Sequence, residues 1–328
     1  MRRKNNSNLE EVPKNVSEYT SPLLINRIKR AYTYGSVFIL ARKGIAKVIS
    51  SFLMKLLGIK KNLDLSGILP TPAHIVDVGA ADGFDPRWRQ FGSKLHLTLF
   101  EPDSESFDKL RTDYKNDPRV KCLKIALSSS SGKRKFYMTA WPRASSVYKP
   151  NEKFFEKHSL RDYFKIVRTI EVETRKLVDC CEPFDFIKID TEGHELDILL
   201  GAENLIDGCV GVLIEVHFND MRYNGDAPLF GDVDNYIRSK GFKLIEIRSP
   251  TGTHYLVKHR NLQSKGFILS SDFLYFRLPT NVIELLRDGK WELKQIAKTA
   301  ALYLSLGNFE FAYILMREAV CNGLISDQ

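Results

Sequence analysis

The 328-residue sequence lacks the features that mark several classes of protein. Its five cysteines include no Cys-x-x-Cys pair and no cysteine–histidine spacing typical of a zinc site, so neither structural zinc nor a disulfide framework is expected. No run of about 20 apolar residues predicts a membrane span, and no apolar run follows the basic N-terminus as in a secretory signal. Together these absences predict a cytoplasmic protein with reduced thiols.

Excess positive charge is confined to the N-terminus. The formal net charge is +9, yet residues 1–60 hold 12 Lys and Arg against 3 Asp and Glu, and the remaining residues are balanced. A nucleic-acid surface needs Lys and Arg along one face of the fold, so no nucleic-acid partner is predicted. Residues 1–22 predict a flexible N-terminus. Residues 23–69 predict a basic helical segment whose apolar residues recur at helical spacing within 36–60. That amphipathic helix fits packing on the domain or peripheral contact with the inner face of an anionic membrane.

From residue 70 the pattern changes to strands alternating with helices, which is typical of an α/β fold with a parallel sheet. A third strand is expected over Val120–Leu127, followed by a strand pair around an aromatic-rich insert at 141–164. Residues 281–328 predict a helical hairpin that turns at Gly307. Because one such hairpin cannot bury its own apolar face, it is expected to pack on the domain or on a second copy of the chain.

A first chemical motif joins a buried strand to a glycine turn. Ile75–Val78 leads into Gly79-Ala-Ala-Asp-Gly83, and Glu101 ends the next strand, where an acid can accept both ribose hydroxyls of a nucleoside. The turn lacks the third glycine of G-x-G-x-x-G, and its acids Asp82 and Asp85 would repel a phosphate. The same acids suit the cationic S-adenosylmethionine, so a nicotinamide-dependent dehydrogenase is the weaker alternative.

A second motif ends a buried strand in a cluster of acids. In Ile187–Leu196 the strand is followed by Asp190, Glu192, His194 and Glu195. His194 is the first candidate for general base, and the acids around it are expected to raise its pKa and orient its ring. His217, near the end of the next strand, is the second candidate. Either histidine could equally be structural, and Glu192 could simply cap the following helix.

Several strings resemble the FkbM family of S-adenosylmethionine-dependent methyltransferases. The resemblance covers residues 70–280 and implies one class I methyltransferase domain: a Rossmann-like, seven-stranded, mostly parallel sheet with helices on both faces, here with helical N- and C-terminal extensions. It also implies O-methylation of a hydroxyl on a glycan, glycolipid or related secondary metabolite. Family members commonly have Asn where this chain has Ala81. The matching strings are Val76–Ala80, Phe100–Pro102, Ile125–Ser128 with Gly132, Ser145-Ser146, Ile187–Leu196 and Leu200–Ala202.

Roles can then be assigned by position, both to residues in the matching strings and to residues near them. The expected cofactor-binding residues are Asp77, Gly79, Ala80, Asp82, Gly83, Glu101, Pro102, Ala126 and Asp190. The expected catalytic residues are His194, Asp190, Glu192 and His217. No metal site is predicted, although Asp190, Glu192 and Glu215 carry oxygen ligands whose spacing fits no established pattern. Trp141 in the insert is expected to form part of the wall of the acceptor site. The alternative from outside enzymology is a degenerate methyltransferase fold that acts as a scaffold through its terminal helices.

Overall fold

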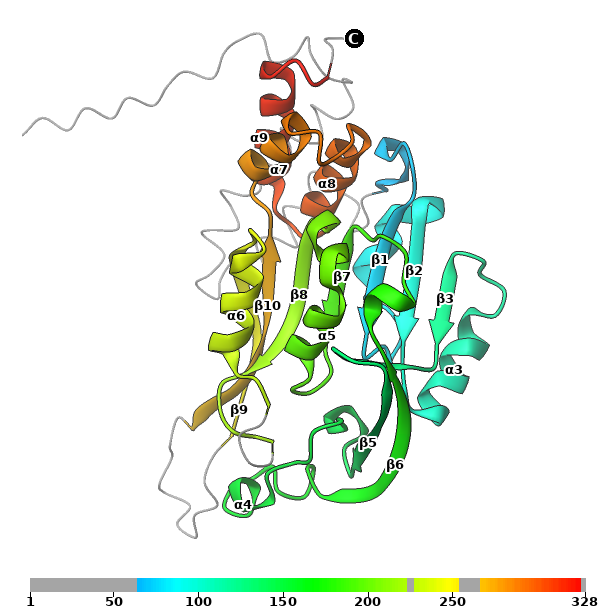
Figure 1. Ribbon diagram of the computed structural model, residues 1–328, viewed down its shortest axis with the longest axis vertical. Helices are drawn as coiled ribbons and strands as arrows, with labels where there is room; N and C mark the ends of the chain where they lie inside the picture. The colour runs from blue at the N-terminus through cyan, green and yellow to red at the C-terminus, as the bar shows by residue number, and fades with distance from the viewer. Residues whose placement is uncertain (1–63, 223–226, 254–265, 326–328) are drawn as a thin grey trace, which may run out of the picture.

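The computed structural model describes residues 64–222, 227–253 and 266–325, and its centre is a seven-stranded sheet (Figure 1). The sheet order is β3-β2-β1-β7-β8-β10-β9, and β10 runs antiparallel to both of its neighbours. The prediction of an α/β fold with a mostly parallel, seven-stranded sheet is therefore confirmed. The strands are β1 (Ala73–Val78), β2 (Leu95–Phe100), β3 (Val120–Leu123), β7 (Phe186–Ile189), β8 (Gly211–His217), β9 (Lys243–Thr253) and β10 (Phe267–Phe276).

The central strands read as continuous apolar runs because both faces of the sheet are covered. Ile75 and Phe186 point to one apolar cluster, while their neighbours Val76 and Ile187 point to the other. Alternate residues of each strand therefore serve different layers, and a polar residue in these runs has to find a partner within the sheet. Asp77 and Lys188 are two such residues, and they are cross-strand partners.

Helices cover both faces of the sheet. The apolar cluster that contains Val76 and Ile187 packs under α5 (Glu195–Gly201) and α6 (Phe230–Ser239). The cluster on the other face, which contains Ile75 and Phe186, is covered largely by α7 (Pro279–Arg287), α8 (Lys294–Ser305) and α9 (Phe309–Cys321). Gly307, with φ +85°, reverses the chain between α8 and α9, and the buried Tyr303 donates a hydrogen bond to the carbonyl of Arg277. The C-terminal helices thus pack on their own chain's sheet, and their predicted use in oligomers stays a prediction.

A second, three-stranded sheet follows β3. It consists of β4 (Ala126–Leu127), β5 (Gly132–Thr139) and β6 (Ile166–Arg175), in the order β4-β6-β5. The expectation of one unbroken strand over Val120–Leu127 is wrong, because the neighbouring strand β2 ends at Phe100, which pairs with Leu123. Beyond that pair the chain has no neighbour in the main sheet, and Ala126 pairs with Thr174 of β6 instead.

The insert connects β5 to β6 and contains α4 (Glu152–Phe155). Its aromatic side chains pack largely on one another: Phe155 stacks on Phe164 with ring centroids 3.9 Å apart. Figure 1 shows the insert beyond the carboxyl ends of the main parallel strands, which is the edge where doubly wound sheets bind ligands.

The N-terminal segment lies outside the described residues, including the helix predicted over residues 36–60. In the three ranges that are described, no helix combines the length and the apolar character needed to span a membrane. Peripheral contact with a membrane remains a prediction from the sequence.

Candidate active site

The glycine turn is fixed between the ends of three strands. The backbone N–H groups of Gly79 and Ala80 both donate to the carbonyl of Phe100, at 3.1 and 3.2 Å. Gly79 and Gly83 have φ values of +82° and +87°, in the left-handed region that favours glycine. A Cβ on Gly79 would lie 2.0 Å from the carbonyl oxygen of Asp190. Glycine at position 79 is therefore a steric requirement of the way β1, β2 and β7 end together.

Asp77 and Asp190 share one lysine. The Lys188 ammonium lies 3.5 Å from Oδ1 of Asp77 and 3.2 Å from Oδ2 of Asp190. Burial raises the pKa of Asp77 to about 6, and Lys188 limits that rise. Burial alone would lower the pKa of Lys188, but the two carboxylates raise it instead. Oδ2 of Asp77 is buried and has no hydrogen-bond partner among the described residues, so this carboxylate can still accept a bond from a ligand.

Replacing Lys188 by methionine tests this arrangement. Loss of the shared cation leaves two carboxyl groups facing each other, so we expect Lys188→Met to lower the free energy of unfolding by about 3 kcal/mol. The matched control is Lys133→Met, because Lys133 pairs with Glu171 on the exposed face of the small sheet and should matter little. Urea unfolding at neutral pH measures both variants. An equal loss in the two would contradict a special role for Lys188.

Glu101 lies at the end of β2, close to the turn. Its side chain is 5% exposed, and burial raises its pKa to about 7. One carboxylate oxygen accepts the backbone N–H of Asp103 at 2.9 Å. The charge of Asp82 contributes to the raised pKa, which places this turn residue near Glu101. Asp77, Glu101 and the turn thus meet at one sheet edge, with Pro102 directly after Glu101. Ala126 lies in β4, and its place beside the adenine stays a prediction.

Asp190 is hydrogen-bonded to a second carboxyl group. Burial, together with the neighbouring Glu192 and Asp190, raises the pKa of Glu215 well above its ordinary value. Burial would also raise the pKa of Asp190, but Lys188 and the bond from Glu215 lower it. Glu215 therefore holds the proton and donates it to Asp190, while it accepts the hydroxyl of Ser270 at 2.7 Å. The Asp190 side chain is 39% exposed, so within this pair Asp190 faces the open edge.

Glu192 faces His217 and an arginine that sequence reasoning missed. Arg222 is 1% exposed; it donates through Nη2 to Oε2 of Glu192 at 2.6 Å and through Nη1 to the carbonyl of Ala144 at 3.2 Å. His217 Nε2 lies 3.4 Å from the same Glu192 oxygen. Arg222 follows β8 in an irregular stretch, where no motif or periodicity marks it in the sequence.

His194 does not behave as the sequence suggested. The expectation that acids would raise its pKa is wrong: burial lowers the pKa of His194 to about 4, with Asp197 opposing this. The carboxylate of Glu195 is engaged elsewhere, since it accepts the backbone N–H groups of Thr191 and Gly193. The His194 ring instead packs edge-on against Tyr148 of the insert, with ring centroids 5.3 Å apart. The histidine is thus neutral at neutral pH and faces the small sheet, whereas His217 is the one beside Glu192.

The insert reaches the glycine turn through an ion pair. Nε of Arg143 lies 2.8 Å from Oδ2 of Asp82, and both side chains are exposed. Two residues before Arg143, the Trp141 ring is 41% exposed and packs edge-on against Tyr163. An exposed aromatic face therefore lies a short distance along the chain from the glycine turn.

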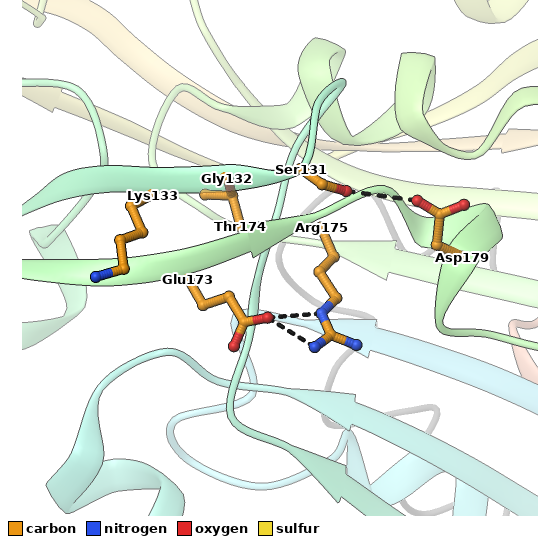
Figure 2. Close-up of a pocket in the computed structure, with 7 residues that line it drawn as sticks. All are labelled: Ser131, Gly132, Lys133, Glu173, Thr174, Arg175 and Asp179. Atoms are coloured by element: carbon orange, nitrogen blue, oxygen red, sulfur yellow. Dashed lines mark hydrogen bonds and ion pairs between the residues drawn. The ribbon is translucent and has the colours of Figure 1, made fainter.

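One hollow in the surface lies away from these residues. It has a volume of about 460 Å³ and is lined by the small sheet and its flank, as Figure 2 shows. Its polar walls are internally paired, with Ser131 bonded to Asp179 and Glu173 to Arg175. It contains none of the strand-end residues, so we place the chemistry at the strand ends, where unpaired and strained groups gather.

Comparison with known proteins gives this arrangement a family context. The profile described as Methyltransferase FkbM domain matches residues 77–244, just over half of the chain. The 2-O-methyltransferase NoeI of Sinorhizobium fredii is 26% identical over 208 residues, covering 58% of this chain and 80% of NoeI. The hexuronic acid methyltransferase AglP of Haloferax volcanii is 29% identical over 126 residues, covering 38% of this chain and 48% of AglP. A crystal structure of Methyltransferase FkbM from Methylobacillus flagellatus is 17% identical with a TM-score of 0.37, covering 67% of this chain and 45% of that one.

Proposed function

We propose that this chain, which belongs to the FkbM methyltransferase family, transfers the methyl group of S-adenosylmethionine to a hydroxyl of a sugar residue. Family membership confirms the enzyme class and the family resemblance that the sequence predicted. The observation that carries the proposal is the meeting of Asp77, the glycine turn and Glu101 at the carboxyl ends of β1 and β2. A sugar acceptor is supported by two relatives, which are named as a 2-O-methyltransferase and a hexuronic acid methyltransferase.

The residues at the turn fit the cofactor that the family implies. S-adenosylmethionine supplies a methyl group already activated by a sulfonium leaving group. We assign the unpartnered Oδ2 of Asp77 to its ammonium group and Glu101 to its ribose hydroxyls. Four further residues have supporting roles. Gly79, Ala80 and Gly83 let the backbone approach the cofactor closely, and Asp82 adds negative charge beside the cationic cofactor. Pro102 and Ala126 are proposed to flank the adenine.

The acceptor is proposed to bind between Asp190 and the insert. The acceptor oxygen forms a bond to the methyl carbon as the carbon–sulfur bond breaks, and alignment of these atoms is the main contribution of the protein. Asp190 is the partly exposed carboxylate at this point, so we assign the hydroxyl proton to it. The His194 ring, enclosed by Tyr148 and Asp197, is proposed to position the insert.

Methyl transfer is tested directly with the full-length protein. We expect incubation with S-adenosylmethionine and a panel of neutral sugars and uronic acids to give at least one product heavier by one methyl group, detected by mass spectrometry. The negative control is Asp77→Asn, which keeps the shape of the side chain and removes its charge. A folded protein that fails to bind S-adenosylmethionine would contradict the enzymatic proposal and favour the scaffold alternative. Methylation confined to non-sugar acceptors would contradict the sugar assignment alone.

Trp141 is proposed to stack on the acceptor ring. Removing its exposed face should weaken acceptor binding, so we expect Trp141→Ala to raise the acceptor KM about tenfold, equivalent to about 1.4 kcal/mol. S-adenosylmethionine affinity should not change, because Trp141 lies outside the glycine turn. Steady-state kinetics measures both quantities, and Trp141→Phe, which keeps an aromatic face, should restore most of the loss. An unchanged acceptor KM in Trp141→Ala would remove this residue from the acceptor site.

A further inference from the structure

Three side chains that the cofactor does not require meet at the carboxyl ends of β7 and β8. Glu192 lies in the turn after β7, while Glu215 and His217 lie two residues apart at the end of β8. One oxygen or nitrogen atom from each lies within 4.8 Å of the others. We propose that this triad (Glu192, Glu215 and His217) binds a divalent transition-metal cation. The sequence offered Glu192 and Glu215 as oxygen ligands but predicted no metal site, because their spacing fits no established pattern; the fold adds His217 beside them.

His217 is the strongest indication of a missing ligand. Its side chain is 2% exposed, and neither ring nitrogen has a hydrogen-bond partner within the described part of the chain. Nε2 lies 3.4 Å from Oε2 of Glu192, at an orientation that does not make a hydrogen bond. Buried polar groups left without a bond are unfavourable. A cation bound by both groups satisfies the imidazole and the carboxylate together.

The backbone at Glu192 is strained, as is common for residues that form binding sites. Glu192 has φ +62°, a left-handed conformation that costs a non-glycine residue about 1 kcal/mol or more. The next residue is Gly193, where a Cβ would lie 3.5 Å from Cε1 of His217 and 3.2 Å from Cγ of Arg222. The strained residue and the glycine after it together let the Glu192 carboxylate reach the end of β8.

Arg222 is the group that most opposes a cation here, because its guanidinium donates to Oε2 of Glu192. Its other terminal nitrogen is held by the carbonyl of Ala144, which anchors the guanidinium on the side of the insert. Lys188 is a second nearby cation, since it lies against Asp77 and Asp190, but the carboxylates of Asp77, Asp190, Glu192 and Glu195 outnumber the two cations. Glu195 acts on both Arg222 and His217, and Asp190 acts on His217 and is bonded to Glu215. The local field therefore still favours a cation.

The ligand atoms indicate which cation fits. Glu215 releases its proton to solvent when the cation binds, so the ligands are one imidazole nitrogen and two carboxylates. This set suits Mn²⁺, Fe²⁺ or Zn²⁺ better than Ca²⁺ or Mg²⁺, which prefer oxygen alone. Bonds of about 2.2 Å require ligand atoms no more than about 4.4 Å apart, so a closure of a few tenths of an ångström completes the site. Three protein ligands leave positions open. One role for the cation rests on the proposed function. The acceptor hydroxyl binds at an open position, where the cation lowers the pKa of that hydroxyl and Asp190 accepts its proton.

The test uses Mn²⁺ alone, added to the full-length protein without S-adenosylmethionine. We expect calorimetric titration to show a single Mn²⁺ per chain, and electron spin echo spectra of the bound ion to show coupling to an imidazole nitrogen. His217→Asn and Glu215→Gln each remove one ligand with little change of shape. Each should weaken binding by more than about tenfold, since even indirect partners of metal ligands contribute that much. His158→Asn, which alters a buried histidine outside the triad, should bind like the wild type.

The outcomes separate this inference from the proposed function. A folded wild type that binds neither Mn²⁺ nor Zn²⁺ overturns the site, as does binding that persists unchanged in both ligand variants. If a variant does not fold, as thermal unfolding would show, the nitrogen coupling in the wild type decides alone, and its absence overturns the site. Methyl transfer by a protein that binds no cation overturns only the metal site. Cation binding without methyl transfer leaves the metal site standing and overturns only the proposed reaction.

Discussion

Gly79→Ala is expected to abolish S-adenosylmethionine binding and to destabilise the whole domain. The new Cβ would lie 2.0 Å from the carbonyl oxygen of Asp190, a backbone atom that cannot rotate away, and φ at this position is +82°. The steric clash and the unfavourable φ for alanine act together, so the free energy of unfolding should fall by about 4 kcal/mol. To relieve the clash, the ends of β1 and β7 have to separate, which disrupts the turn that approaches the cofactor. Urea unfolding and calorimetric titration of the cofactor measure the two losses.

Gly231→Ala is the matched control for this change. A Cβ on Gly231, in the first turn of α6, meets nothing within 4 Å, and alanine is favoured over glycine in helices by about 0.5–1 kcal/mol. The control should therefore be as stable as the wild type or slightly more stable, with unchanged cofactor affinity. If Gly79→Ala were to behave like Gly231→Ala, the close approach of β1 and β7 described for this turn would be incorrect.

S-adenosylmethionine affinity is expected to rise with pH until about pH 7 and then to level off. The pKa of Glu101 is raised to about 7, so below that pH the carboxyl carries a proton and cannot accept both ribose hydroxyls. Two hydrogen bonds to the ionised carboxylate favour its charged form, which means that binding lowers the pKa and releases a proton. Affinity therefore increases with pH between the pKa of the complex and that of the free protein.

Glu101→Ala should weaken binding about 100-fold at neutral pH, given about 1.5–3 kcal/mol for a hydrogen bond to a charged group.

Glu101→Gln distinguishes this group from Asp77. The pKa of Asp77 is about 6, so its ionisation also strengthens binding of an ammonium group, but over a lower pH range. In Glu101→Gln the affinity should level off near pH 6 instead of near pH 7, because only Asp77 still titrates. Calorimetry between about pH 5.5 and pH 8, in two buffers of different ionisation enthalpy, measures both the affinity and the proton release. An identical pH profile in wild type and Glu101→Gln would exclude Glu101 from the ribose site.

The main sheet could be predicted because its signal is local. Strands such as β1 and β7 are short apolar runs that bury both faces, and a glycine or an acid marks where each one ends. The split between β3 and β4 could not be predicted in the same way. Val120–Leu127 is suitable for a strand throughout, and the break after Leu123 depends on the length of β2, a neighbour distant in sequence.

The site was predictable to the extent that it follows strand ends. Asp77, Gly79 and Glu101 lie together because parallel strands end at a common edge. The pKa of His194 was predicted with the wrong sign, because the sequence places acids beside it without showing that their carboxylates turn away and that burial dominates. Arg222 was missed altogether, since its contacts with Glu192 and Ala144 join segments that lie far apart in the chain.

The way the insert is attached also bears on how enzymes of this shape diversify. The insert leaves through β5 and returns through β6, which pair with each other, so its length can change without disturbing the main sheet. Two of its contacts reach the carboxyl edge of the sheet: Arg143 pairs with Asp82, and the carbonyl of Ala144 accepts a hydrogen bond from Arg222. On the side of the insert, the second of these contacts uses only a backbone carbonyl, which any residue can supply, while the donor is the Arg222 side chain. Further contacts join the insert to α5 and to the stretch after β8: the Tyr148 hydroxyl donates to Asp197, and Asn151 donates to the carbonyls of Asp220 and Met221. We therefore expect acceptor preference to move with the insert in a chimera that keeps Arg143, Tyr148 and Asn151.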